Sequence, residues 1–77
     1  MRKKDRYLVE LGAQIRSIRE NKGFSQEGLA LEAKIDRSYY GAIERGERNV
    51  SFLTLIRIAK SLKCNITNFV KEIPNGK

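Results

Sequence analysis

The chain has 77 residues with 16 Lys and Arg against nine Asp and Glu, which gives a formal net charge of +7 and a pI near 9.9. A chain this short has room for one small domain, residues 1–77, and no room for a deep catalytic cavity. Cys64 is the one cysteine of the chain, so the chain cannot form an intrachain disulfide. The chain also has no histidine and therefore lacks the usual zinc ligands, so that no metal or other cofactor is expected.

The positive charge is typical of proteins that bind a polyanion, although small proteins also carry excess charge for solubility. Met1 to Lys4 are expected to form a frayed basic arm, which either touches phosphates or is merely solvated. No apolar run of signal-peptide length follows this arm, and no stretch approaches the roughly 18 apolar residues of a membrane span. We therefore expect a cytoplasmic protein that has no membrane partner.

A first helix is expected from about residue 5 to residue 22, because its apolar residues recur every three or four positions and therefore share one face. Asp5 suits the N-cap of this helix, and Gly23 suits the left-handed position that ends it. The apolar residues of the shared face are Leu8, Leu11, Ile15 and Ile18.

Two shorter helices follow, separated by a turn. The first runs from Gln26 to about Ala33 behind the N-cap Ser25. Asp36 caps the next helix, which runs from Arg37 to about Arg45 and is ended by Gly46. The residues expected to face inward are Leu29, Ala30, Ala33, Ile35, Tyr40 and Ile43. The residues of the later helix expected to face outward are Arg37, Ser38, Tyr39, Gly41 and Ala42.

Ser51 caps a fourth helix, Phe52 to Leu62, and Asn65 caps a short fifth helix that ends near residue 71. The expected core face of the fourth helix consists of Phe52, Leu55, Ile58, Ala59 and Leu62, and the short fifth helix carries the apolar residues Ile66, Phe69 and Val70. Cys64 is expected to be a small buried hydrophobe, with a redox role as the rarer alternative. No segment alternates with a period of two, so the predicted fold is all-α with five helices and a polar tail at residues 74–76.

Residues 25–45 have the layout of a helix-turn-helix, in which one helix lies across the DNA backbone and the next enters the major groove. Over about residues 8–69 the chain resembles the Cro/repressor-type (Xre) helix-turn-helix family. The resemblance is carried by Ser25 to Glu27 with Leu29 and Ala30, by Ile35 to Tyr39, by Ile43 to Asn49, and by Leu55, Ile58 to Leu62 and Phe69. Within the family, the small size and the run DRSYY…IERGERNVS are most similar to controller proteins of restriction-modification systems.

The N-terminal turns of the third helix are expected to read DNA bases. Arg37 is the best candidate, because a guanidinium can donate two hydrogen bonds to guanine O6 and N7. Ser38 can bond several bases, Tyr39 can reach a phosphate or stack on a sugar, and Ala42 offers a methyl contact to thymine. The blander alternatives are a solvated arginine and an ordinary surface tyrosine.

A second group of residues is expected to contact phosphates, which positions a protein on DNA but reads no sequence. The resemblance assigns such a contact to Gln26, and helix N-termini favour anions in any case. Arg45, Arg48 and Asn49 follow the third helix where the chain should run beside the DNA backbone, and Ser51 adds a polar group at the next helix. Ordinary solvation is the alternative for each basic residue.

The resemblance also implies three structural features beneath these contacts. Arg19 and Glu44 are expected to pair and to hold the third helix against the first. Lys34 stands where the family usually has glycine, so that a lysine is expected at positive φ. Gly28 replaces the usual acidic residue of the second helix, at a cost of about 0.5–1 kcal/mol relative to alanine. The geometry of the turn should therefore depend on the core beneath it.

A homodimer is expected, because two such units related by a twofold axis read a near-palindrome in major grooves about 34 Å apart. Residues 52–71 contain more apolar side chains than one core face needs, which suggests a self-complementary interface. The candidates for this interface are Leu53, Ile56, Ile66 and Val70. Scattered surface apolar residues are the alternative.

The expected function is sequence-specific regulation of transcription, in which the protein occupies a near-palindromic operator on double-stranded DNA and blocks or recruits RNA polymerase. The alternatives are a phage-type repressor, an antitoxin-type module that binds a protein, and a non-specific binder of nucleic acid, for which only Tyr39 offers stacking. An enzyme is not expected, since the chain has no histidine, no paired carboxylates with a pocket and no phosphate-binding glycine loop.

Overall fold

The computed structural model describes residues 4–70, which form four α-helices and one 3₁₀-helix. In chain order the elements are α1 (Arg6–Asn21), α2 (Gln26–Ala33), α3 (Arg37–Glu44), α4 (Phe52–Leu62) and η1 (Ile66–Phe69). The predicted all-α class is confirmed. The predicted fifth helix is shorter than expected, because η1 is a single 3₁₀ turn in which the backbone N–H of Asn68 donates to the carbonyl of Asn65 at 2.9 Å. Most of the basic arm and the whole polar tail lie outside the described residues.

Each α-helix begins at a side-chain oxygen that accepts a hydrogen bond from one of the free backbone N–H groups of the first turn. The carboxylate of Asp5 accepts from the N–H of Tyr7 at 2.8 Å. Ser25, Asp36 and Ser51 accept in the same way at the start of α2, α3 and α4, at 2.9, 3.0 and 3.1 Å. The N-caps predicted from the sequence are therefore confirmed.

Residues in the left-handed conformation end the helical segments. Gly23 and Gly46 have φ values of 84° and 74°, as expected for glycines in this role. Lys34 has a φ of 59°, so the predicted positive φ of this lysine is confirmed. Lys63, which ends α4, has a φ of 55° and is not predicted by the sequence. Both lysines adopt a backbone conformation that is mildly unfavourable for residues with a Cβ.

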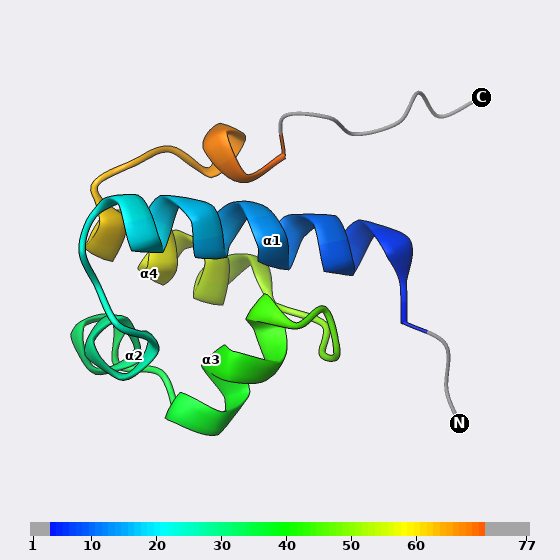
Figure 1. The fold of residues 1–77 in the computed structure, drawn as a ribbon, viewed down its shortest axis with the longest axis horizontal. Helices are drawn as coiled ribbons and strands as arrows, with labels where there is room; N and C mark the ends of the chain where they lie inside the picture. Colours follow the sequence, from blue (N-terminus) through cyan, green and yellow to red (C-terminus); the bar gives the residue numbers. More distant parts are fainter. Residues whose placement is uncertain (1–3, 71–77) are drawn as a thin grey trace.

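The helices surround a small core with α1 on one side of it. α1 packs against α3 and η1, which lie on opposite sides of α1 in Figure 1, whereas α2 packs against α3 and α4. The large side chains buried between these elements are Ile15, Leu29, Tyr40, Ile43, Ile58, Leu62 and Phe69. α3 is thus held from two directions, by α1 and by α2, and only part of its surface remains exposed.

Phe52 does not belong to this core, and the prediction that it does is wrong. Its side chain is 67% exposed, although its spacing from Leu55 would place both on one face of the helix. Phe52 is the first residue of α4, and the neighbouring elements cover only the later turns, where Ile58, Ala59 and Leu62 are buried. The periodicity of a helix gives the direction of a side chain, but it does not show where the covering elements stop.

Candidate nucleic-acid interface

The N-terminal turn of α3 presents two exposed polar side chains, Arg37 and Ser38. In Figure 1 this turn lies at the lower edge of the molecule, on the side away from α1. Asp36 fixes its geometry, since the carboxylate accepts a hydrogen bond from the backbone N–H of Tyr39 at 3.0 Å. A guanidinium and a hydroxyl at the exposed start of a helix can form hydrogen bonds with the edges of bases in a major groove.

Tyr39 links α3 to the loop that follows it. Its hydroxyl donates to the backbone carbonyl of Asn49 at 3.1 Å, and the guanidinium carbon of Arg48 lies 5.2 Å from the centre of its ring. The sequence indicates Tyr39 only as a separate DNA contact, and no pattern relates it to residues nine and ten positions later. The structure instead uses this half-buried ring to couple the loop to α3.

Ala42 does not face outward as predicted, because it is only 8% exposed, and Gly41 beside it is buried as well. α3 has eight residues and packs against both α1 and α2, and all of its residues from Tyr40 to Glu44 are buried. The polar surface that α3 offers to a ligand is therefore concentrated at Arg37 and Ser38, with Tyr39 beside them.

The residues expected to contact phosphates have two different surroundings. Arg45, Arg48 and Asn49 are exposed in the loop after α3, and Ser51 is exposed at the N-cap of α4. Gln26 is half-buried instead, and its side-chain amide donates a hydrogen bond to Oε1 of Glu44 at 2.9 Å. This bond ties the first residue of α2 to the last residue of α3, a connection that the sequence does not predict.

A buried ion pair between Arg19 and Glu44 lies beneath α3, where the resemblance places it. Nε of Arg19 is 2.6 Å from Oε2 of Glu44 and Nη2 is 3.2 Å from Oε1, and each residue is 7% exposed. Oε2 also accepts a hydrogen bond from the hydroxyl of Tyr40, and Nη1 of Arg19 donates to the backbone carbonyl of Phe24 at 2.6 Å. One carboxylate therefore joins side chains from α1, α2 and α3.

This network stabilises the ionised form of Glu44. Burial by itself would raise the pKa of the carboxyl group, but hydrogen bonds from Arg19, Tyr40 and Gln26 outweigh burial and lower the pKa below its usual value near 4.5. The hydrogen bond to Glu44 raises the pKa of Arg19, and burial, assisted by Glu44, raises the pKa of Tyr40. Every buried side-chain polar atom in the described residues has a hydrogen-bond partner, so the network satisfies its own buried groups while it joins the three helices.

Lys4 and Gly12 make contacts near the end of α3 that no pattern in the sequence indicates. The carboxylate of Glu47 lies 3.0 Å from Nε of Arg45 and 3.7 Å from Nζ of Lys4. Gly12 of α1 lies against the end of α3, where an added Cβ would be 2.4 Å from the carbonyl oxygens of Ile43 and Glu44. Lys4 and Gly12 are far in sequence from the residues that they approach, so only the fold brings them together.

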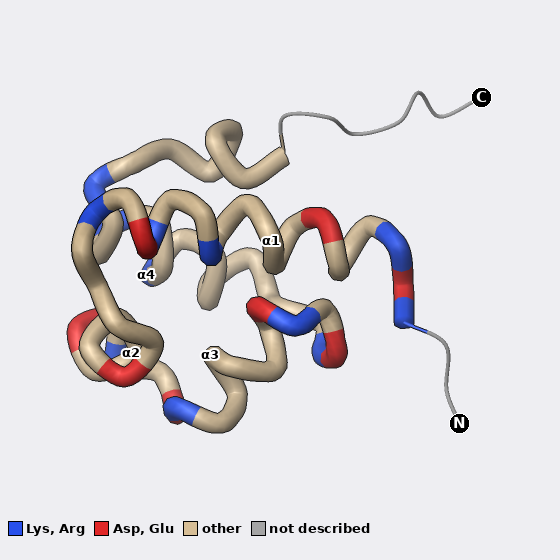
Figure 2. Tube along the Cα trace, viewed as in Figure 1, with Lys and Arg blue, Asp and Glu red and all other residues tan. Residues whose placement is uncertain are grey.

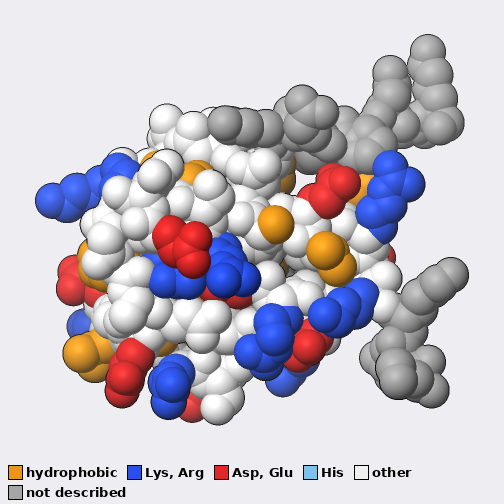
Figure 3. Space-filling model, viewed as in Figure 1, with side chains coloured by type: hydrophobic (Ala, Val, Ile, Leu, Met, Phe, Trp, Pro, Cys, Tyr) orange, Lys and Arg blue, Asp and Glu red, His pale blue; other side chains and the backbone are white. Residues whose placement is uncertain are grey.

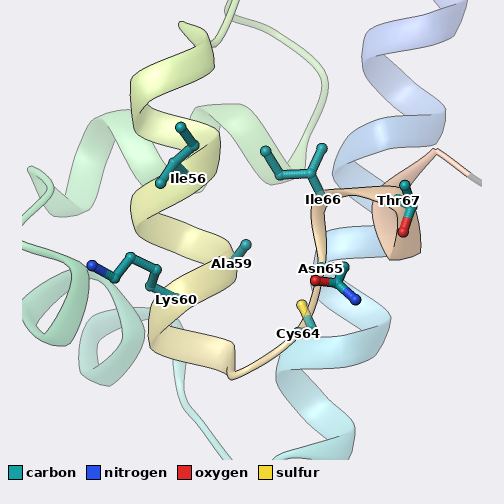
Figure 4. Close-up of a pocket in the computed structure, with 7 residues that line it drawn as sticks. All are labelled: Ile56, Ala59, Lys60, Cys64, Asn65, Ile66 and Thr67. Carbon is teal, nitrogen blue, oxygen red and sulfur yellow. The ribbon is translucent and has the colours of Figure 1, made fainter.

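Two of the four residues expected at a dimer interface, Ile56 and Ile66, line a common groove. Leu53 is 58% exposed, whereas Ile56, Ile66 and Val70 are half-buried. Figure 4 shows Ile56 on α4 and Ile66 at the start of η1 on two sides of a shallow groove of about 510 Å³. Cys64 in the wall of this groove is only partly buried, and burial raises the pKa of its thiol.

Within residues 4–70, no cluster of three or more His, Cys, Asp or Glu side chains is placed to hold a metal ion. In the same part of the chain, none of the helices has the length and apolar character needed to cross a membrane.

Residues 15–69 match the helix-turn-helix family model. The control protein C.MunI of a Mycoplasma species is 33% identical over 66 residues, which span 84% of this chain and 89% of the relative. The crystal structure of the restriction-modification controller protein C.AhdI from Aeromonas hydrophila matches with a TM-score of 0.79 and 42% identity, over 80% of this chain and 94% of that one. The controller protein C.Esp1396I, crystallised as a tetramer in complex with its natural 35 base-pair operator, matches with a TM-score of 0.78 and 34% identity, over 87% of this chain and 88% of that one.

The capped helices α2 and α3, the exposed polar turn at the start of α3 and the similarity across most of the chain lead to the same assignment. The chain belongs to the helix-turn-helix family, is a DNA-binding regulator of transcription rather than an enzyme, and resembles the controller proteins of restriction-modification systems.

Proposed function

We propose that the chain is the controller protein of a restriction-modification system, which binds a near-palindromic operator as a homodimer and thereby blocks or recruits RNA polymerase in the cytoplasm. The observation that carries this proposal is the exposed pair Arg37 and Ser38 on a helix turn that Asp36 caps and that the Arg19–Glu44 pair supports from below. The similarity to the control protein C.MunI and to the controller protein C.AhdI favours this role over that of an antitoxin-type module.

In the proposed complex, Arg37 and Ser38 meet base edges and provide the sequence preference. Tyr39 lies next to them and contacts the sugar-phosphate backbone through the outer edge of its half-buried ring. Ala42 adds little to base reading, since its 8% exposure leaves only a small methyl surface for thymine. The discrimination between operators therefore depends mainly on one arginine and one serine in each subunit.

A second group of residues holds the DNA backbone in the same complex. Arg45, Arg48 and Asn49 are exposed in the loop after α3, and Ser51 begins α4. The N-terminus of α2, which begins at Gln26, faces a phosphate, while the side-chain amide of Gln26 keeps its hydrogen bond to Glu44. These contacts set the register of the protein on the duplex and read no sequence.

Dimerisation through Leu53, Ile56, Ile66 and Val70 would place two copies of α3 in successive major grooves. The relative C.Esp1396I was crystallised as a tetramer in complex with its natural 35 base-pair operator, which supports binding of this chain to DNA by more than one copy.

The proposal can be tested with a duplex that the protein selects from a random pool and a scrambled duplex of equal length. Arg37→Ala should weaken binding to the selected duplex by about 1–3 kcal/mol per half-site and relax the preference at one base position in each half-site. Arg48→Ala should weaken both duplexes alike and reduce the slope of log affinity against log salt by about one per subunit. Wild-type affinity that depends on salt but not on sequence would reject the proposal.

A further inference from the structure

A single carboxylate lies among the basic side chains of the loop after α3. Oε1 of Glu47 is 3.0 Å from Nε of Arg45, and Oε2 is 3.7 Å from Nζ of Lys4, so that each oxygen faces one cation. Figure 2 shows acidic and basic residues following one another along this loop, and Figure 3 shows red side chains intermixed with blue ones on this face of the molecule. The surface is therefore not an unbroken basic patch.

The backbone holds Glu47 at this position. Gly46 has a φ of 74°, and the N–H of Glu47 donates to the carbonyl of Ala42 at 2.9 Å, which closes the helix in a Schellman-type turn. α1 supports the turn from the other side, since an added Cβ on Gly46 would lie 2.6 Å from the Cα of Val9. The backbone of Glu47 therefore cannot move away from Arg45 and Lys4 without disturbing the end of α3.

The two ion pairs of Glu47 are exposed and therefore weak. The side chains of Lys4, Arg45 and Glu47 are 51%, 54% and 41% exposed. Pairs in such surroundings contribute little to stability, because water and salt screen them. A DNA phosphate can displace the carboxylate from either cation, but the carboxylate then stays beside the DNA backbone with its negative charge.

We propose that Glu47 is an internal counter-charge, which competes with DNA phosphates for Arg45 and Lys4 and so weakens binding to every duplex. The inference rests on the proposed function, because it places the loop after α3 against the DNA backbone. Phosphate contacts supply nearly all of the affinity for non-operator DNA. Glu47 thus limits the non-specific affinity of a small chain whose net charge is +7.

Glu47→Gln tests the proposal, since it removes the charge and keeps the size of the side chain. The variant should bind the selected and the scrambled duplex more tightly by the same factor, roughly threefold per subunit at 0.1 M salt. The slope of log affinity against log salt should become steeper by about one per subunit, because an additional phosphate contact is made. The ratio of the two affinities should not change, as the loop reads no bases.

Glu32→Gln is the matched control, because it removes the same charge from an exposed position on α2. It should leave the affinities for both duplexes nearly unchanged. If Glu32→Gln and Glu47→Gln instead increased the affinity equally, the effect would come from net charge alone and the proposal would be overturned. A double-mutant cycle adds a second measurement. In an Arg45→Ala background the effect of Glu47→Gln should become smaller, since one of the two released cations is absent.

The opposite sign would also overturn the proposal. If Glu47 holds Arg45 in the orientation that a phosphate needs, Glu47→Gln weakens binding and makes the salt slope shallower. Thermal unfolding of each variant checks that it is folded. If the glutamine variant does not fold, Glu47→Ala takes its place in the same binding measurements. Failure of the proposed function gives a different result, namely wild-type protein that binds the selected and scrambled duplexes equally.

Discussion

At the scale of single residues, Glu44 is the side chain on which three helices converge. It belongs to α3 and accepts hydrogen bonds from Arg19 of α1, Gln26 of α2 and Tyr40 of its own helix. A buried ion pair adds little net stability by itself, but removing one partner leaves the other charge buried and costs about 3–5 kcal/mol. The carboxylate therefore matters chiefly because its loss would leave the guanidinium of Arg19 without a partner.

Glu44→Gln should lower the free energy of unfolding at pH 7 by about 3 kcal/mol. The pKa of Glu44 in the folded protein lies below its usual value near 4.5, so the stabilisation is complete above that pH and is lost as the pH falls through the folded pKa. The difference in unfolding free energy between wild type and variant should therefore be constant near neutral pH and shrink below about pH 4.5. Urea unfolding at a series of pH values measures it.

Glu20→Gln is the control for this measurement. Oε2 of Glu20 is 3.1 Å from Nε of Arg16 and 3.8 Å from Nη2 of Arg19, so this variant touches the edge of the network and leaves Glu44 in place; the side chains of Glu20 and Arg16 are more than half exposed. Such a pair contributes about 0–1 kcal/mol, so this variant should stay close to wild type at every pH. A difference between wild type and Glu44→Gln that does not change with pH would show that the pKa of Glu44 is the same in the folded and the unfolded protein, so that the network does not favour the ionised carboxylate.

At the scale of helices, the direction of α3 depends on two close contacts between α1 and the backbone at the C-terminal end of α3. Gly12 lies against the carbonyl groups of Ile43 and Glu44, and Val9 lies against Gly46. In both contacts the absence of a side chain on glycine allows the close approach. Together they hold the C-terminal end of α3, and the position of this end sets where its exposed first turn points.

Gly12→Ala should force α1 and α3 apart, because the new Cβ would lie 2.4 Å from two backbone carbonyl oxygens that cannot rotate away. We expect a loss of about 1–3 kcal/mol in unfolding free energy, together with weaker operator binding at a temperature where the variant is still folded. Urea unfolding and binding to the selected duplex measure the two effects.

Gly28→Ala provides the comparison on α2. Its Cβ would be 3.0 Å from Oγ of the N-cap Ser25, and alanine gains about 0.5–1 kcal/mol in helix propensity over glycine. These effects oppose each other, so stability should stay within about 1 kcal/mol of wild type. If Gly12→Ala instead matched wild type in stability and operator affinity, the backbone contact between α1 and α3 would not position the recognition helix.

At the scale of the whole molecule, α4 carries apolar surface that one copy leaves uncovered. Phe52 and Leu53 are 67% and 58% exposed, and the groove between Ile56 and Ile66 lies along the same helix. A surface of this kind on a small basic protein fits an interface with a second copy. Joining two recognition helices would multiply the sequence preference of each one.

Leu53→Asp should produce monomers without unfolding the chain, because the side chain is already largely exposed in one copy. Operator affinity should fall at least tenfold, since the two half-sites are no longer bound by one particle. Sedimentation at tens of micromolar protein measures the oligomeric state. Leu31→Asp makes the same change at a position on α2 that is 80% exposed, and it should leave the oligomeric state unchanged. A Leu53→Asp protein that sediments like wild type would place the interface elsewhere.

The local features of the fold could be predicted from the sequence, because they depend on residues a few positions apart. Asp5, Ser25, Asp36 and Ser51 cap the four α-helices as their residue types and places indicate. The left-handed conformation of Lys34 was predictable from its place in the family pattern. A helix start requires only a hydrogen bond within one turn, so no knowledge of the fold is needed, whereas the left-handed Lys63 at the end of α4 was not predicted.

Tertiary structure alone decided which faces are covered and which distant groups meet. Ala42 is buried and Phe52 exposed, against the prediction, because burial depends on where neighbouring helices begin and end. The Arg19–Glu44 pair joins residues 25 positions apart and could be expected only through the family resemblance. The contact of Lys4 with Glu47 had no such guide. Charges that are distant in sequence interact only once the packing of α1 against α3 has brought them within a few ångströms of each other.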